Sequence, residues 1–469
     1  MSHRAEYPVL ETTDLTPFTG VTADDEAWLR RLAQAADTGL LTLRLSRRDA
    51  EEAEPVVFFD EKYGCWWAGR YIGEVYYQGR TLRILPRFGM PQLQRWLSRI
   101  WGVRLLSTKG RYEKARIWLW ELLAKLWETR LLSAAKHGVP TFRLDELHRG
   151  QTIRGRLQVR LTAKEFSTGR QIVVSRTRNR HIDHRIGGVI VYAFEHLRRE
   201  LRHLGDERSW LTQRGQSLIA QLRAHITRHE AVAAAESRVP IRYTPITESY
   251  REVVELSRAI GRQQPSSSTI GGSSDVLGVL IDMAEVWELY VYHLLRSTLR
   301  GVEVIHTGRD SNASNCLLRS DQTGEQLGRL KPDILVLSPD TNRLLAIFDA
   351  KYKTTTPTRE RPHGILREDL YQMAAYLSAF GQPTELLNGG LVYPAAENTP
   401  NILALQSKSP WHLSATKRQL WFFGLPCQEI SRSGMEQSQE ELVFIEGVQG
   451  ALEQRLTVGL AARRSYEDV

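Results

Sequence analysis

Two short apolar segments bring carboxylates and an amine close together in the sequence. The first runs over Lys331–Leu337 with Asp333 near its polar start, and the second runs over Leu344–Lys351 and ends in Asp349-Ala350-Lys351. Both are rich in residues that favour strands, and the polar residues 338–342 between them are typical of a hairpin loop. Because side chains alternate along a strand, Asp349 and Lys351 share one face. The pattern predicts two carboxylates and an ammonium at one end of a buried sheet.

Two aspartates in such a place favour a hard divalent cation. Buried charges are costly unless they are paired or hold a metal, and Mg²⁺ takes few protein ligands and keeps several waters. A metal lowers the pKa of a bound water and stabilises charge on a phosphoryl oxygen, and the ammonium of Lys351 would orient that water or neutralise the phosphate. The residues predict phosphodiester hydrolysis with Mg²⁺, with Mn²⁺ as the alternative. A lone Asp-x-Lys is more often a solvated strand face. The prediction therefore depends on the order and spacing of these residues, on the hairpin and on the two helices described next.

Helical patterns flank the hairpin on both sides. Residues 282–292 carry apolar side chains at helical spacing before it. Residues 367–377 form a second helical pattern after it, in which Gln372 and Tyr376 lie four positions apart on one face. The hairpin is therefore expected to lie between two helices.

This arrangement resembles the PD-(D/E)xK nuclease superfamily. The resemblance implies that Asp333 and Asp349 hold the metal with help from the Ala350 carbonyl, and that Lys351 positions or activates the water. It also implies that Gln372 orients the active site or the phosphate. The upstream helix often gives a further acidic ligand in this superfamily, for which Glu288 is the first candidate and Glu285 the second.

Several further stretches resemble the McrC family, the nuclease subunit of modification-dependent restriction systems, over roughly residues 60–395. Residues 71–87 are similar to the N-terminal β segment that ends in I-x-P-K, with Arg87 in place of the usual lysine. Ile153–Leu157, residues 179–193 and Gly390–Pro394 are similar to later elements. The longer N-terminal stretch, the C-terminal tail and the residues after Arg156 depart from the family pattern.

The McrC resemblance implies a division of labour with a partner. In that family a separate McrB-like AAA+ GTPase recognises modified DNA and forms a ring. The McrC-like subunit docks on the ring through its N-terminal part, stimulates GTP hydrolysis and cuts double-stranded DNA. This chain has no GxxxxGK[ST] motif, which agrees with a nucleotide-hydrolysing partner. The N-terminal and central basic segments are the candidates for docking and stimulation.

Composition and charge agree with a globular protein that meets a polyanion. The 469 residues are 42% hydrophobic and 25% charged, with a net charge of +9. The three cysteines lie far apart without a CxxC motif, which favours a reducing cytoplasm over a disulfide framework or a zinc ribbon. The N-terminus lacks an apolar signal segment and no apolar run is long enough to span a membrane. The expected location is cytoplasmic.

Arginines are frequent from residue 150 to residue 230. Such residues suit salt-sensitive, sequence-independent phosphate contacts, and they would equally suit an acidic protein partner. The sequence His181-Ile182-Asp183-His184 is a weak metal candidate, and a solvated helix start is the better interpretation. The residues predicted to contact DNA are Lys353, Arg154, Arg156, Arg176 and Arg178.

The expected fold is α/β (α+β overall), with a small N-terminal β-rich domain and a C-terminal restriction-endonuclease-like domain whose mixed sheet is flanked by helices. The turn-rich residues 261–274 mark a boundary before the nuclease helix. The expected ranges are 1–55 as an N-terminal extension, 56–150 as a β-rich then helical partner-docking domain, 151–262 as an arginine-rich helical region, 263–275 as a linker or loop, and 276–469 as the nuclease domain with its tail.

Two other functions compete with the restriction subunit. The chain could be a non-catalytic adaptor that activates a partner ATPase or GTPase, but an intact Asp-Asp-Lys set argues against a degenerated site. It could also be a stand-alone nuclease in nucleic-acid repair or processing. Cleavage by the isolated chain, without any nucleotide triphosphatase, would favour that third function.

Overall fold

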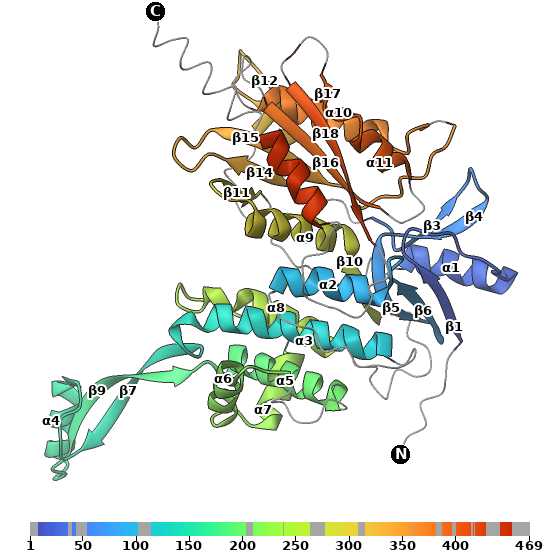
Figure 1. Cartoon of the computed structure of the whole chain (residues 1–469). Helices are drawn as coiled ribbons and strands as arrows, with labels where there is room; N and C mark the ends of the chain where they lie inside the picture. The colour runs from blue at the N-terminus through green and yellow to red at the C-terminus, as the bar shows by residue number, and fades with distance from the viewer. Residues whose placement is uncertain are drawn as a thin grey trace, which may run out of the picture. The chain divides into compact units, whose positions relative to one another are not determined.

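The chain forms two compact units, one of residues 1–109 with 274–469 and one of residues 110–273 (Figure 1). The computed structural model describes residues 8–35, 40–43, 54–101, 114–202, 210–237, 239–262, 277–307, 315–359, 361–380, 387–395, 400–413, 416, 418–427 and 441–452. The predicted linker at 263–275 lies outside these residues. No helix in the described part is long and apolar enough to cross a membrane.

The first unit begins with a mixed sheet in the order β1-β6-β5-β10-β2. Helix α1 (Ala23–Ala35) packs on it through Trp28, whose indole Nε1 donates to the Tyr77 carbonyl at 3.0 Å. Gly73 has φ +140° and lies so close to Val279 that a Cβ would be 2.1 Å from its carbonyl oxygen, so glycine is required there. The strands are β1 (Val9–Thr13), β2 (Leu40–Leu43), β5 (Tyr71–Tyr77), β6 (Arg80–Leu85) and β10 (Leu277–Asp282), with the hairpin of β3 (Val57–Asp60) and β4 (Cys65–Ala68) beside them.

Strand β10 leads directly into the helix that precedes the predicted hairpin. Asp282 ends β10 and caps α9 (Met283–Thr298), because its Oδ1 accepts the Ala284 amide at 2.9 Å. Arg70 holds the same carboxylate from the N-terminal sheet, with Nη2 2.9 Å from Asp282 Oδ2. The start of α9 is therefore fixed by the N-terminal sheet.

The second sheet of this unit has the order β11-β14-β15-β16-β18-β17. Strands β14 and β15 pair antiparallel, as the predicted hairpin requires, whereas β15, β16 and β18 run parallel. All nine residues of β16 are buried, which places it at the centre of the core. The strands are β11 (Glu303–His306), β14 (Ile334–Leu337), β15 (Leu344–Ala350), β16 (Leu387–Ala395), β17 (Trp411–His412) and β18 (Arg418–Pro426).

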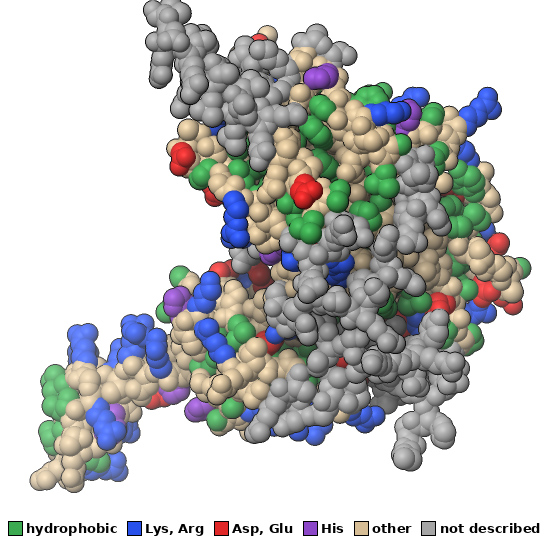
Figure 2. Space-filling model, in the orientation of Figure 1, with side chains coloured by type: hydrophobic (Ala, Val, Ile, Leu, Met, Phe, Trp, Pro, Cys, Tyr) green, Lys and Arg blue, Asp and Glu red, His purple; other side chains and the backbone are tan. Residues whose placement is uncertain are grey.

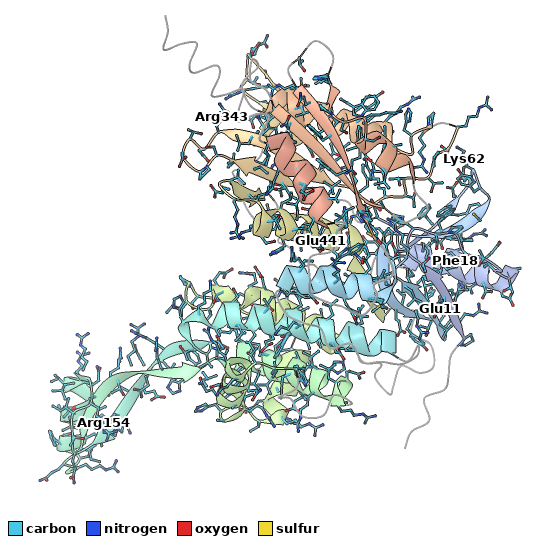
Figure 3. The ribbon with its side chains drawn as sticks, in the orientation of Figure 1. Glu11, Phe18, Lys62, Arg154, Arg343 and Glu441 are labelled. Carbon is cyan, nitrogen blue, oxygen red and sulfur yellow. The ribbon has the colours of Figure 1, made fainter. Side chains whose placement is uncertain are left out.

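Helices cover both faces of this sheet (Figure 1). On one face α10 (Arg367–Ala379) and α11 (Pro400–Gln406) share a core with Ile347. On the other face, the Trp287 indole of α9 donates to the Val392 carbonyl at 3.1 Å, and the helical residues 441–452 pack Phe444 on Phe423. Glu441, labelled in Figure 3, accepts the Tyr290 hydroxyl of α9 at 2.6 Å. The predicted mixed sheet flanked by helices is present, with a small hairpin of β12 (Asn315–Arg319) and β13 (Gln326–Leu330) beside it.

The second unit consists of helices and one long ribbon. Its helices pack around α5 and share buried contacts such as that from the Trp127 indole to the Ser257 hydroxyl at 2.8 Å. They are α3 (Lys114–Ala134), α5 (His184–Glu200), α6 (Gln213–Arg223), α7 (Arg228–Glu236) and α8 (Arg251–Arg262). In the ribbon, β7 (Thr141–Gly150) pairs with β9 (Val173–Ile182), and β8 (Arg156–Leu157) and α4 (Val159–Ser167) lie at its end.

The predicted class of mixed α and β structure is confirmed. The arginine-rich region over 151–262, expected to be helical, carries the helices α4 to α8, but Arg176, Arg178 and Arg180 lie on β9. The helix α2 (Gly89–Trp101) and α3 agree with the helical part expected within residues 56–150. The two units also group the chain differently from the expected ranges, because residues up to 109 join the C-terminal part.

Candidate active site

The hairpin places two buried aspartates side by side. Asp333 precedes β14 and Asp349 lies near the end of β15. The two residues are 7% and 2% exposed, respectively. The Ala350 amide donates to Asp333 Oδ2 at 2.8 Å, so the first aspartate is fixed against the backbone next to the second. The antiparallel register pairs Ile334 with Phe348, which brings both carboxylates to the same end of the hairpin.

Lys351 connects these carboxylates to the downstream helix. Its Nζ forms an ion pair with Asp349 and donates to Gln372 Oε1 of α10 at 2.6 Å. The Gln372 amide in turn donates to the Tyr376 hydroxyl at 2.7 Å, and that hydroxyl donates to the Lys331 carbonyl at 3.2 Å. The predicted residues Asp333, Asp349, Lys351 and Gln372 are thus brought together, and Tyr376 ties Gln372 to the start of the hairpin.

The electrostatics reflect two carboxylates in a buried place. Burial, and then the charge of Asp333, raises the pKa of Asp349 to about 7, although the ammonium of Lys351 opposes this. For Lys351, burial lowers the pKa, but the charges of Asp349 and Asp333 outweigh it and the net pKa is raised. The lysine is therefore charged beside the two buried aspartates.

One further acidic residue, Asp369, belongs to this site and was not predicted from the sequence. Asp369 of α10 is 1% exposed and accepts from the Lys353 ammonium at 2.7 Å and from the Tyr393 hydroxyl at 2.9 Å. Asp369 lies three positions before Gln372 on the same helix, a spacing that puts both on one face and was the available signal. Lys353, predicted to contact DNA, is therefore engaged by Asp369 in this structure, with its side chain 39% exposed.

The upstream helix has the predicted place, but its acidic residue has a different partner. Glu288 of α9 is 3% exposed, and its Oε1 lies 2.8 Å from His306 Nε2 of β11. No group of three or more His, Cys, Asp or Glu side chains in the described parts of the chain is arranged to hold a metal ion. The structure therefore pairs Glu288 with His306 instead of placing it in a three-carboxylate cluster with Asp333 and Asp349.

The remaining donors fit a hard divalent cation. The two carboxylates provide oxygen ligands only, which Mg²⁺ and Mn²⁺ prefer, and the Ala350 carbonyl stays a prediction. Mg²⁺ keeps several waters, so two protein carboxylates suffice. The raised pKa of Asp349 supports this fit, because a cation between the carboxylates would offset the burial and the charge repulsion that keep the proton bound.

The four predicted DNA-contacting arginines lie on or beside the ribbon of the second unit. Arg156 of β8 faces Arg176 of β9 directly, although like charges opposite each other destabilise a sheet. Arg178 has an acidic neighbour, with its Nε 3.9 Å from Asp145 Oδ1. Arg154, labelled in Figure 3, is exposed at the β8 end. Figure 2 shows Lys and Arg side chains gathered along this ribbon, so its surface is strongly basic.

The far end of the ribbon is apolar as well as basic. Ile153, Val159 and Phe166 are 58%, 69% and 52% exposed there. At the other end, Asp183 caps α5 by accepting the amides of Arg185 and Ile186 at 3.0 and 3.2 Å. The expectation that residues 181–184 begin a helix is therefore confirmed.

Comparisons with known proteins give a family match and weak structural matches. The family profile of the "McrBC 5-methylcytosine restriction system component" matches residues 67–394. A refined half-complex from the tetradecameric assembly of Thermococcus gammatolerans McrB AAA+ hexamers with bound McrC aligns over 94% of this chain and 99% of its own, at 15% identity and a TM-score of 0.48. The cryo-EM structure of the T. gammatolerans McrBC complex aligns over 61% and 86%, at 16% identity and a TM-score of 0.31. The comparison with curated proteins gives no match.

Proposed function

The chain belongs to the family of McrBC 5-methylcytosine restriction system components, and on that premise we propose that it is the subunit that cleaves DNA. The resemblance to the McrC family noted in the sequence is confirmed by this match. The proposed activity is a Mg²⁺-dependent endonuclease of the PD-(D/E)xK type, with Mn²⁺ as an alternative metal. The proposed substrate is double-stranded DNA in a system that responds to modified bases.

One observation carries the nuclease proposal. Lys351 is held by Asp349 on one side and Gln372 on the other, while Asp333 is fixed beside them by the Ala350 amide. The site buries Asp333 and Asp349 at one end of a hairpin and holds Lys351 with a further hydrogen bond to Gln372. Neighbouring buried carboxylates have a clear use where a cation binds.

The residues divide the work of phosphodiester hydrolysis among them. Asp333, Asp349 and the Ala350 carbonyl would hold the metal, which when bound supplies an activated water and stabilises charge on the phosphate. The ammonium of Lys351 orients the attacking water or offsets charge that develops on a phosphate oxygen. Gln372 keeps this ammonium in place through the hydrogen bond at 2.6 Å, and Tyr376 keeps Gln372 in place. The preformed network reduces reorganisation during the reaction.

We also propose that the chain works with a McrB-like AAA+ GTPase. The matched family is one component of a restriction system, so further components are expected, and this chain has no nucleotide-binding P-loop motif of its own. The basic ribbon of the second unit is a candidate for contacts with DNA phosphates or with an acidic face of this partner. Exposed apolar residues at its end, such as Val159 and Phe166, favour a protein contact there.

The test compares DNA cleavage by the wild type with that by Lys351→Ala, each alone and with a McrB-like AAA+ protein, Mg²⁺ and GTP or ATP. The matched control is Lys408→Ala, which removes an exposed lysine of the same unit. We expect cleavage by the wild type and the control only in the complete mixture, and a loss of at least about 100-fold for Lys351→Ala. Equal cleavage by Lys351→Ala would refute the assignment. Wild-type cleavage without partner would indicate a stand-alone nuclease.

Unchanged stimulation of nucleotide hydrolysis, with no cleavage by the wild type under any metal, would instead favour the adaptor function. Hydrolysis and cleavage are therefore measured in the same samples. A variant that still stimulates nucleotide hydrolysis but does not cleave DNA has lost the catalytic site, whereas a variant that does neither has lost the complex.

A further inference from the structure

A buried cluster joins the N-terminal sheet to the segment that follows strand β15. Asp14 comes directly after β1 and is fully buried, and Tyr352 comes two residues after β15 and is 4% exposed. The Tyr352 hydroxyl donates to Asp14 Oδ2 at 2.8 Å. The two residues are 338 positions apart in the chain, so the contact closes one of the longest loops in the first unit.

Arg87 lies at the centre of this cluster. It follows β6, and its backbone amide donates to Asp14 Oδ1 at 2.7 Å while its Nε lies 3.8 Å from Asp14 Oδ2. The guanidinium carbon lies 4.4 Å from the centre of the Tyr352 ring and 4.8 Å from that of Phe88. Its Nη2 donates to the Lys353 carbonyl at 3.3 Å. One arginine therefore contacts the side chain of one residue and the backbone of the next.

The contacts of Tyr352 lie on the opposite side of the backbone from the candidate active site around Lys351. Lys351 turns to Asp349 and Gln372, whereas Tyr352 turns to Asp14 and Arg87. The Lys351 amide also donates to the Val392 carbonyl at 2.9 Å, which extends the pairing of β15 with β16 by one residue. Because adjacent side chains point in opposite directions, holding Tyr352 and the Lys353 carbonyl fixes the direction in which Lys351 points.

We propose that Arg87 is a positioning residue for Lys351: with Asp14 it clamps residues 352 and 353 so that the lysine ammonium stays between Asp349 and Gln372. The inference rests on the proposed nuclease function for its kinetic consequence, but the clamp itself is a property of the free protein. The clamp also gives a role to Arg87, which occupies the position of the lysine in the I-x-P-K element. A lysine at that position would keep a cation over the Tyr352 ring.

The experiment uses the full-length chain with Arg87→Met, Arg87→Lys and the control Arg83→Met. Arg83 lies on β6 as well and pairs with Glu74 and Glu11 at 2.8 and 3.2 Å, so its replacement removes a similar ion pair from the same strand. Hydrogen exchange of the peptide that contains the Lys351 amide is measured in the free protein, and DNA cleavage is measured in the complete mixture. Thermal unfolding identifies any variant that does not fold.

We expect Arg87→Met to speed exchange of the Lys351 amide about tenfold or more. We also expect it to lower the kcat of cleavage about 10- to 100-fold with KM changed less than about twofold, because a small displacement of a catalytic group mainly affects the chemical step. Arg87→Lys is expected to recover most of both losses. Arg83→Met is expected to match the wild type in exchange, and its kcat shows how much of a loss comes from removing an ion pair of the same strand.

Exchange and kcat that are the same in Arg87→Met as in Arg83→Met would overturn the proposal. If the wild type cleaves nothing, the nuclease function fails while exchange still decides whether the clamp exists. If Arg87→Met does not fold, Tyr352→Phe decides instead, because it keeps the ring and loses only the hydrogen bond to Asp14. Tyr352→Phe is then expected to lower kcat several-fold, and unchanged exchange and kcat in this variant would refute the clamp.

Discussion

Replacement of Asp349 by asparagine is expected to flatten the pH dependence of stability of the metal-free protein. Burial, and then the neighbouring charge of Asp333, raises the pKa of Asp349 from an ordinary 3.8 to about 7. In the unfolded chain the Asp349 carboxyl loses its proton near pH 4, as an ordinary aspartate does. In the folded chain it keeps the proton until about pH 7. Because the folded state holds more protons between these values, stability falls as the pH rises through them and stays at the lower level above.

The size of the effect follows from the same two pKa values. Each pH unit between them changes the free energy of unfolding by about 1.4 kcal/mol. A rise from pH 5 to pH 7 should therefore cost the wild type roughly 2 kcal/mol through Asp349 alone, because the folded protein has lost half of this proton at pH 7. Asparagine does not titrate, so the stability of Asp349→Asn relative to the wild type should rise by a similar amount over this range. Lys351 keeps its hydrogen bond to Gln372 in the variant.

The assay is urea unfolding in EDTA at pH 5, 6, 7 and 8, followed by tryptophan fluorescence. Comparison of the two proteins at each pH cancels the titration of groups that do not interact with Asp349, so only the difference in slope is used. Parallel pH dependence of the two proteins would mean that Asp349 ionises with an ordinary pKa. That result would contradict the close placement of two buried carboxylates in the metal-free site.

Four further predictions follow from the site and its surroundings. At pH 8, Mg²⁺ at ten times its dissociation constant should stabilise the wild type by about 1.4 kcal/mol in thermal unfolding, but not Asp349→Asn. Gln372→Ala should lower the kcat of DNA cleavage about tenfold with little change in KM, because the ammonium of Lys351 loses its orienting acceptor. In urea unfolding, the stability of Glu121→Gln relative to the wild type should be greater at pH 8 than at pH 5. Burial raises the pKa of Glu121 to about 7, so the wild type loses stability as this carboxyl ionises, whereas glutamine does not titrate. Arg176→Ala should reduce the slope of log affinity for DNA against log salt by about one in fluorescence titrations, and an unchanged slope would exclude a phosphate contact.

Much of the hairpin site could be predicted because its signals are local. The alternation of side chains and the turn residues at 338–342 determine the hairpin, and helical spacing identifies the helices on both sides. The four residues Asp333, Asp349, Lys351 and Gln372 lie within these elements, so their meeting follows from the order of strand, strand and helix. Strand β14 is shorter than expected, since it begins at Ile334 and shifts register between Val336 and Leu337.

What could not be predicted depends on contacts between segments far apart in the chain. Glu288 is on the expected helix, but its partner His306 comes from a strand whose position no local pattern reveals. Asp369 was passed over because its burial depends on Lys353 and Tyr393. The insertion of β10 into the N-terminal sheet likewise joins residues 277–282 to β5 and β2, which no composition shift indicates.

The ribbon of the second unit departs from the helical structure expected over 151–262, although α4 to α8 lie in that range. Arg176, Arg178 and Arg180 nevertheless alternate with Thr177 and Asn179, which is the period of a strand. The ten-residue register with β7 follows that alternation. Here periodicity was the informative signal.

The central claim is that Asp349 serves cleavage and not the partnership with a nucleotide-hydrolysing ring. The most direct measurement is DNA cleavage and nucleotide hydrolysis, in one sample, by wild type and Asp349→Ala with a McrB-like AAA+ protein, Mg²⁺ and GTP. We expect both proteins to stimulate hydrolysis equally and only the wild type to cut DNA. Full cleavage by Asp349→Ala in that assembled complex would contradict the account.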